Sequence, residues 1–300
     1  MGYLEHFGLQ HEPFSNAPDA RFYFDSEPHV QALRRLLFAV DSNKGLGVVV
    51  GDIGTGKTTL ARRMLEHLDQ QRYQSSLLIM VHSGVTPEWL LKHIAMQMGV
   101  SSPGEDRLVI LRQLYDRLLE IDAQGRRAVV LIDEAQMLQT RELMEEFRGL
   151  LNLEIPGRKL LNIVFFGLPE LEENLRLDPP LAQRVAVRCQ LGALNARGTA
   201  SYIWHRLQIA GGQRMVFEAD AIAAVHQFSS GVPRLINTLC DNCLFEGAGL
   251  RTAQVTEQIV IDMARALDLQ AGSASLSGEV DLDDGIAQIE AMLERLEMKF

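Results

Sequence analysis

A short glycine-rich stretch between an apolar run and a helical pattern constrains this chain more than any other feature. Residues Gly51 to Thr58 read Gly-Asp-Ile-Gly-Thr-Gly-Lys-Thr, which fits the phosphate-binding pattern G-x-x-x-x-G-K-[ST]. The apolar run Val48 to Val50 precedes the stretch, and a helix-like segment from Thr59 to Leu68 follows it. Glycines let the backbone turn its N–H groups around a phosphate, and a helix that begins there adds the positive end of its dipole. The stretch therefore predicts a nucleoside triphosphate site built from a strand, a loop and a helix.

Each residue of this loop has an expected role. Lys57 is expected to reach the β- and γ-phosphates, and the Thr58 hydroxyl is expected to hold Mg²⁺. The expected nucleotide contacts are Gly51, Asp52, Ile53, Gly54, Thr55, Gly56, Lys57, Thr58 and Thr59. The predicted cofactors are therefore ATP and Mg²⁺.

A second acidic motif follows an apolar strand pattern. Val129 to Ile132 are apolar, and Asp133 and Glu134 come directly after them. At the carboxyl edge of a parallel sheet, Asp133 would hold Mg²⁺ and Glu134 would polarise the water that attacks the γ-phosphate. An exposed acidic strand end is common by itself, but its order after the phosphate loop favours a Walker B motif.

Length and composition favour one large or two modest domains. The 300 residues are 47% hydrophobic, and no run approaches eighteen uninterrupted apolar residues, so no membrane span is expected. The N-terminus lacks the basic and apolar segments of a secretory signal. Three cysteines fit a reducing compartment better than a disulfide framework. We expect a cytoplasmic protein, which reaches the inner membrane through a partner if it acts there.

The net charge limits the partners that the chain can have. A formal charge of −10 argues against broad electrostatic binding to nucleic acid or to anionic lipid. Residues 266–300 carry −6 of this charge, so a local basic patch in the rest of the chain stays an open alternative.

Apolar strand patterns alternate with helical patterns through the first two thirds of the chain. This alternation predicts an α/β fold with a parallel sheet flanked by helices. The expected strands are 46–50, 76–81, 128–132, 162–166 and 185–191, and the expected helices include 28–41, 87–98 and 107–121.

From residue 195 onward the pattern is helical, which predicts a separate all-helical lid. Its expected helices are 196–209, 218–228, 232–246 and 256–267. The predicted domains are an aromatic N-terminal segment with the first helix (1–45), a nucleotide-binding domain (46–193), the lid (194–268), a flexible linker (269–285) and a C-terminal amphipathic helix (286–300).

The combination of motifs resembles an AAA+ ATPase, a P-loop NTPase with a helical lid. Arg184 precedes the fifth expected strand, and Arg234 lies in a Gly-x-Pro-Arg turn of the lid. More narrowly, the chain is similar to the ExeA/GspA group, which includes MshM-type pilus ATPases and ATPases of exopolysaccharide export. The stretches that carry this resemblance are 7–9, 13–14, 18–23, 133–136, 169–171 and 231–237.

The resemblance implies a site that a neighbouring subunit completes. Arg184 would act as an arginine finger on the neighbour's nucleotide, and Arg234 would contact the γ-phosphate from the lid. With Lys57 and Glu134 these two arginines are the expected catalytic residues. The expected assembly is a nucleotide-dependent homo-oligomer such as a hexamer, and its expected partners are protein components of a secretion, pilus or polysaccharide-export system.

One position departs from the group. Members typically carry Gln where this chain has Leu168, at a position suited to a polar contact near the attacking water. The Leu168 side chain neither donates nor accepts a hydrogen bond, so slow, assembly-dependent hydrolysis is expected.

Three other features leave alternatives open. The fold class also includes DNA-directed ATPases of transposition type, and a nucleotide-dependent scaffold with little hydrolysis is a further alternative. Cys240 and Cys243 have metal-ligand spacing but lie inside an expected helix, where a packing role is favoured. The apolar stripe of 286–300 fits a partner-binding or oligomer-stabilising helix and packing onto its own chain equally well.

Overall fold

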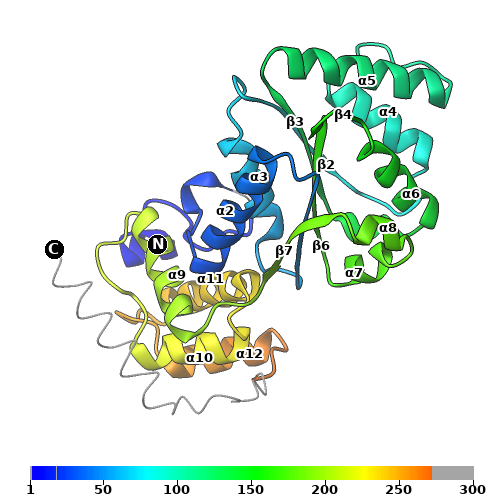
Figure 1. The fold of residues 1–300 in the computed structure, drawn as a ribbon. Helices are drawn as coiled ribbons and strands as arrows, with labels where there is room; N and C mark the ends of the chain where they lie inside the picture. Colours follow the sequence, from blue (N-terminus) through cyan, green and yellow to red (C-terminus); the bar gives the residue numbers. More distant parts are fainter. Residues whose placement is uncertain (1, 18, 272–300) are drawn as a thin grey trace. The chain divides into compact units, whose positions relative to one another are not determined.

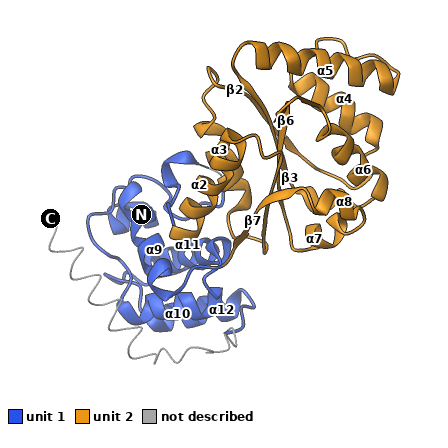
Figure 2. Cartoon of the chain, in the orientation of Figure 1, with its two compact units in different colours: residues 1–26, 193–300 blue, residues 27–192 orange. Residues whose placement is uncertain are grey.

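The computed structural model describes residues 2–17 and 19–271, which fold as two compact units (Figure 2). The first, here called the α/β unit, comprises residues 27–192. The second, here called the helical unit, comprises the described parts of residues 1–26 and 193–300. Each unit buries hydrophobic clusters of its own.

A five-stranded parallel sheet forms the centre of the α/β unit (Figure 1). Its order is β2-β3-β6-β1-β7, and all four neighbouring pairs are parallel. The strands are β1 (Leu46–Gly51), β2 (Tyr73–Ile79), β3 (Arg127–Asp133), β6 (Leu161–Gly167) and β7 (Val185–Leu191). The carboxyl ends of β1, β3 and β6 therefore meet at one edge of the sheet.

Helices cover both faces of the sheet, as the expected α/β fold requires. Alternate strand residues point to opposite faces, so Val129 and Leu131 pack with one set of helices and Val130 and Ile132 with the other. The first set is α2 (Glu27–Asp41) and α3 (Lys57–His67). The second set is α4 (Pro87–Gln97), α5 (Arg107–Ala123), α6 (Arg141–Leu150), α7 (Glu170–Leu175) and α8 (Pro179–Ala182). The short elements η2 (Ala135–Met137) and the hairpin β4 (Glu154–Ile155) and β5 (Arg158–Lys159) complete the unit.

The helical unit combines four C-terminal helices with the N-terminal segment. The helices α9 (Ala196–Ile209), α10 (Ala219–Ser229), α11 (Pro233–Gly249) and α12 (Glu257–Ala266) lie within three residues of their expected bounds. The N-terminal segment contributes α1 (Tyr3–Phe7) and η1 (Ala20–Phe22). Both groups of elements share one core.

Residues 1–45, expected above as one segment, divide between the two units after Ser26. Phe7, Phe14 and Phe22 are buried in the core of the helical unit, whereas α2 packs against the sheet. The aromatic side chains explain the division, because burying them in the helical core removes a large apolar area from water.

Only the first residues of the expected C-terminal linker are among the described residues. The expected linker at 269–285 is described as far as residue 271, and the expected amphipathic helix at 286–300 lies outside the described residues. In the described part of the chain, every helix is too short or too polar to cross a membrane.

Candidate functional site

The loop after β1 requires glycine at several positions. Gly54 and Gly56 have φ values of 82° and 96°, a region that side chains with a Cβ rarely adopt. At Gly51, a Cβ atom would lie 2.5 Å from the carbonyl oxygen of Leu191 and 2.8 Å from the Thr55 hydroxyl. The pattern of glycines in the sequence therefore reflects backbone turns and close approaches that the loop contains.

The loop ends where α3 begins, at Lys57. The first N–H groups of a helix have no acceptor inside it, and Gly56 at the N-cap offers no side-chain cap. Thr55 is almost fully buried and its hydroxyl donates to the Asp52 carbonyl at 2.9 Å, which stiffens the loop. Asp52, Ile53 and Thr59 are exposed. The arrangement is a helix N-terminus open to an anion.

The Lys57 side chain folds back over this loop. Its Nζ donates to the carbonyl oxygens of Gly51 at 2.7 Å and of Asp52 at 2.8 Å. Burial lowers the pKa of Lys57 below its ordinary value, and the nearby charges of Glu134 and Asp133 oppose that shift. The structure thus brings the lysine of the first motif and the acids of the second into one electrostatic environment.

Asp133 ends β3 as a buried carboxylate. Its Oδ1 accepts a hydrogen bond from the Glu134 N–H at 3.0 Å, and its Oδ2 is buried with no hydrogen-bond partner. Burial raises the pKa of Asp133 above its ordinary value, although the Thr58 hydroxyl beside it opposes the shift. An unpaired buried carboxylate oxygen next to a threonine hydroxyl is a donor set that suits Mg²⁺, so these two residues fit the expected metal.

Glu134 adopts an unusual backbone conformation, with φ at 55° and ψ at 36°. A left-handed conformation at a non-glycine residue is strained and persists only where the surroundings hold it. The carboxylate Oε2 accepts a hydrogen bond of 2.6 Å from Nε2 of Gln136, and Oε1 of Gln136 accepts one of 3.1 Å from the Leu168 N–H. Glu134 is therefore linked to the end of β6 through Gln136.

Arg184 lies away from this carboxyl edge. It immediately precedes β7, whose first residue Val185 pairs with Leu46 at the start of β1, while Leu191 pairs with Gly51. Six residues of parallel strand separate that start from the phosphate loop, about 20 Å at 3.3 Å a residue. The Arg184 guanidinium donates a hydrogen bond of 2.5 Å to Oδ1 of Asn152.

Arg234 belongs to the helical unit, where it is exposed as the second residue of α11. The turn before it is tightly held. Gly231 has φ at 72°, and a Cβ atom there would lie 1.8 Å from the Leu194 carbonyl oxygen, so only glycine fits. The Leu194 N–H donates to the Gly231 carbonyl at 2.8 Å. The turn therefore fixes Arg234 firmly within its own unit.

Gln136 has no role in the sequence analysis above, whereas the family resemblance implies that the region around His29 flanks the adenine. Gln136 was visible only as the fourth residue of the Asp-Glu-Ala-Gln stretch. His29 is buried on α2, and its Nε2 would lie 2.8 Å from a Cβ atom at Gly56. The position of His29 beside Gly56 results from tertiary packing, so no local sequence pattern predicts it.

Cys240 and Cys243 behave as core residues. Both are fully buried in α11, and burial raises the pKa of the Cys243 thiol to about 12. Among the described residues, no group of three or more His, Cys, Asp or Glu side chains is placed to hold a metal ion. The favoured packing role agrees with this burial.

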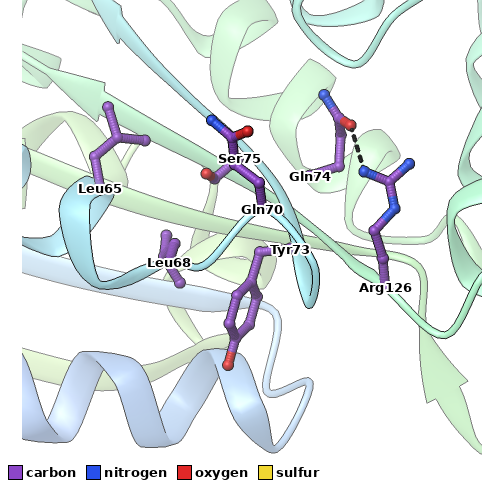
Figure 3. A pocket seen from close by; sticks show the side chains of 7 residues that line it. All are labelled: Leu65, Leu68, Gln70, Tyr73, Gln74, Ser75 and Arg126. Atoms are coloured by element: carbon purple, nitrogen blue, oxygen red, sulfur yellow. Dashed lines mark hydrogen bonds between the residues drawn. The ribbon is translucent and has the colours of Figure 1, made fainter.

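A shallow polar pocket of about 350 Å³ lies elsewhere in the α/β unit (Figure 3). Its lining includes Tyr73, Gln74 and Ser75 at the amino end of β2, and Gln74 accepts a hydrogen bond of 3.0 Å from Arg126. Because the strands are parallel, this end is opposite to the edge that carries Lys57 and Asp133. The pocket is therefore not part of the candidate nucleotide site.

Comparison with known proteins identifies the domain around this site. Residues 40–175 match the AAA domain family. General secretion pathway protein A of Aeromonas hydrophila is 36% identical over 245 residues, which cover 81% of this chain and 44% of that protein. The chain thus spans less than half the length of this relative.

Solved structures share the fold at low sequence identity. Cdc6p of Pyrobaculum aerophilum has a TM-score of 0.64 at 17% identity, covering 85% of this chain and 70% of that one. The ORC1 protein of Aeropyrum pernix, in complex with DNA, has a TM-score of 0.60 at 18% identity, covering 95% and 87%. The RuvB Holliday junction branch migration motor of Thermotoga maritima has a TM-score of 0.55 at 15% identity, covering 87% and 81%. These likenesses concern the fold alone. Together with the AAA domain match, they confirm the expected parallel sheet flanked by helices with a C-terminal helical part.

Proposed function

Since the chain is a member of the AAA+ ATPases related to general secretion pathway protein A, we propose that it binds and hydrolyses ATP to support a cell-envelope machine. The observation that carries the proposal is the meeting of Lys57, Asp133 and Glu134 around an open helix N-terminus. A buried lysine, a buried carboxylate and a second carboxylate at one sheet edge are the groups that phosphoryl transfer needs.

The roles of the residues follow from their chemistry. The N–H groups of the loop and the Lys57 ammonium bind the phosphates, which releases Lys57 from the carbonyl oxygens of Gly51 and Asp52. Thr58 and Asp133 hold Mg²⁺, which neutralises charge on the phosphates when it is bound. Glu134 orients and deprotonates the attacking water.

The position of Arg184 supports a site that is completed between subunits. Within its own chain the residue precedes β7 and lies about 20 Å of strand away from the phosphate loop. A guanidinium there reaches a nucleotide only if that nucleotide belongs to another copy of the chain. We therefore propose a homo-oligomer in which Arg184 stabilises transition-state charge on the neighbour's ATP. Arg234 keeps its proposed role as the γ-phosphate contact of the lid.

The relative named for the general secretion pathway supports a secretion, pilus or polysaccharide-export partner over a DNA-directed role. Its 36% identity is well above the 15% to 18% of the three solved structures, whose likeness concerns the fold alone. The net charge of −10 also disfavours nucleic acid.

The test compares ATP binding with phosphate release in two variants. Glu134→Gln should keep the ATP affinity within about threefold and lower turnover by about 100-fold or more, because only the general base is lost. Lys57→Ala should lose both ATP affinity and turnover. Glu142→Gln, an exposed carboxylate on α6, is the matched control and should behave as wild type. Undetectable ATP binding by the wild-type chain, or wild-type turnover by Glu134→Gln, would refute the proposal.

A further inference from the structure

Gln136 makes a set of contacts that no packing requirement explains. Its side chain is 6% exposed and joins two functional positions, donating to Glu134 Oε2 at 2.6 Å and accepting from the Leu168 N–H at 3.1 Å. Its own carbonyl oxygen accepts a hydrogen bond of 2.9 Å from Nδ2 of Asn174 on α7. Both ends of the amide are therefore oriented, and the backbone behind it is fixed.

The approach of β6 to this side chain is close. A Cβ atom at Gly167 would lie 3.1 Å from Gln136 Oε1 and 3.2 Å from the Gln136 N–H nitrogen. Glycine at the last residue of β6 therefore lets the strand end come near the amide. The sequence Gly167-Leu168 thus presents a backbone N–H to Gln136 at the place where a polar side chain was expected.

The hydrogen bond to Glu134 affects orientation without occupying the whole carboxylate. It uses Oε2, and a carboxylate has acceptor sites on both oxygens, so Oε1 stays available to a water molecule. The Glu134 backbone is in a strained left-handed conformation, which persists only where neighbouring groups hold the residue. A hydrogen bond from a fixed partner to the carboxylate helps to hold it. An amide that is itself held at its other end supplies such a partner.

We propose that Gln136 is the positioning residue for Glu134 and that it connects the general base to the end of β6 through the Leu168 N–H. The proposal rests on the proposed function, in which Glu134 activates water. It explains how a leucine can stand at position 168, because the hydrogen bond to Gln136 comes from the backbone and not from the side chain.

Gln136→Met tests this directly, since methionine keeps the length of the side chain but neither donates to Glu134 nor accepts from Leu168. The kcat for ATP hydrolysis should fall by about 10- to 100-fold, as expected when a catalytic group is displaced by about 1 Å. The KM and the dissociation constant for ATP should change by less than about threefold, because Gln136 touches the base and not the phosphate loop. Glu142→Gln, the exposed control on α6, should leave kcat within about threefold of wild type.

Asn174→Ala separates positioning from support of the turn. It removes the hydrogen bond to the Gln136 backbone and leaves the amide in place, so it should lower thermal stability and leave kcat nearly unchanged. A fall in kcat for Asn174→Ala equal to that for Gln136→Met would show that the turn alone matters, and would overturn the proposal.

Measurements in the Glu134→Gln variant distinguish the proposed role of Gln136 from the proposed ATPase function. In single-turnover assays, adding Gln136→Met to Glu134→Gln should cause no further loss, because the base to be positioned is already absent. A further loss of tenfold or more, or wild-type kcat in Gln136→Met alone, would refute the role of Gln136. Wild-type turnover by Glu134→Gln alone would refute the proposed function instead.

Discussion

At the scale of single residues, the phosphate loop depends on backbone conformations that only glycine adopts easily. Gly56 precedes α3 with φ at 96°, and a Cβ atom there would lie 2.8 Å from His29 Nε2. The sequence pattern was sufficient to predict this loop, because the positive φ values of Gly54 and Gly56 are a local requirement for glycine. Gln136 was different, since its proposed role depends on an N–H group 32 positions away, at the residue that follows β6.

A glycine substitution at the loop can be compared with one at a neutral site. Gly56→Ala should weaken ATP binding by about tenfold or more, since displaced N–H groups lose hydrogen bonds to charged oxygens of about 1.5–3 kcal/mol. Gly125→Ala also has a positive φ, 73°, but a Cβ atom there meets nothing within 4 Å. Both variants should lose about 1–2 kcal/mol of unfolding free energy through backbone strain. Titration calorimetry with ATP should show weaker binding only in Gly56→Ala, and equal ATP affinities would contradict this view of the loop.

At the scale of elements, β1, β3 and β6 were predictable because both faces of each are buried, which leaves continuous apolar runs. The start of β2 was not, because the edge strand begins Tyr73-Gln74-Ser75 and its polar residues interrupt the apolar run. The helix α6 carried usable signals, a Thr140 cap that accepts from the Leu143 N–H and a buried stripe of apolar residues. It nevertheless stands outside the expected helices named above.

One buried arginine holds the N-terminal segment to α9. Arg206 donates to the Pro13 carbonyl, to the Ser15 carbonyl at 2.9 Å and to the Tyr202 hydroxyl at 2.8 Å. Its guanidinium carbon also lies 4.9 Å from the centre of the Phe22 ring. No local sequence pattern reveals the contacts with Pro13 and Ser15, because they join residues almost two hundred positions apart.

Loss of that arginine should release the segment. Arg206→Met should lower the free energy of unfolding of the helical unit by about 2–4 kcal/mol, since carbonyl groups are left without charged donors. Limited proteolysis should then cut faster within residues 2–26. Arg265→Met, at an exposed arginine of α12, should change neither property. Wild-type stability and protection in Arg206→Met would contradict the assigned role.

A half-buried histidine makes the helical unit sensitive to acid. Burial lowers the pKa of His226 below its ordinary value of 6.5, and its Nδ1 lies 2.9 Å from the Thr199 hydroxyl. The unfolded chain therefore binds a proton more readily, so stability should decrease as the pH falls below about 6.5. Urea unfolding at pH 7.5 and pH 5.5 should show this loss, and His226→Asn should reduce it. An unchanged pH dependence in His226→Asn would argue against this source.

At the scale of the whole molecule, the division into units was only partly readable from the sequence. The change from strands to helices near residue 193 is a local signal, and the structure divides the chain at that point. The membership of residues 2–26 in the helical unit is not local, because it depends on buried aromatic side chains and on Arg206. The proposed role of Arg184 likewise depends on strand register, which places this residue at the opposite end of β1 from the phosphate loop.

The shared site can be tested by mixing two inactive variants. Arg184→Ala keeps the loop and the general base, while Glu134→Gln keeps the arginine for a neighbouring subunit. An equimolar mixture at a concentration that supports assembly should recover about a quarter of wild-type phosphate release, since random neighbours complete about one site in four. Phosphate release equal to the mean of the two separate variants, with wild type active under the same conditions, would contradict the account.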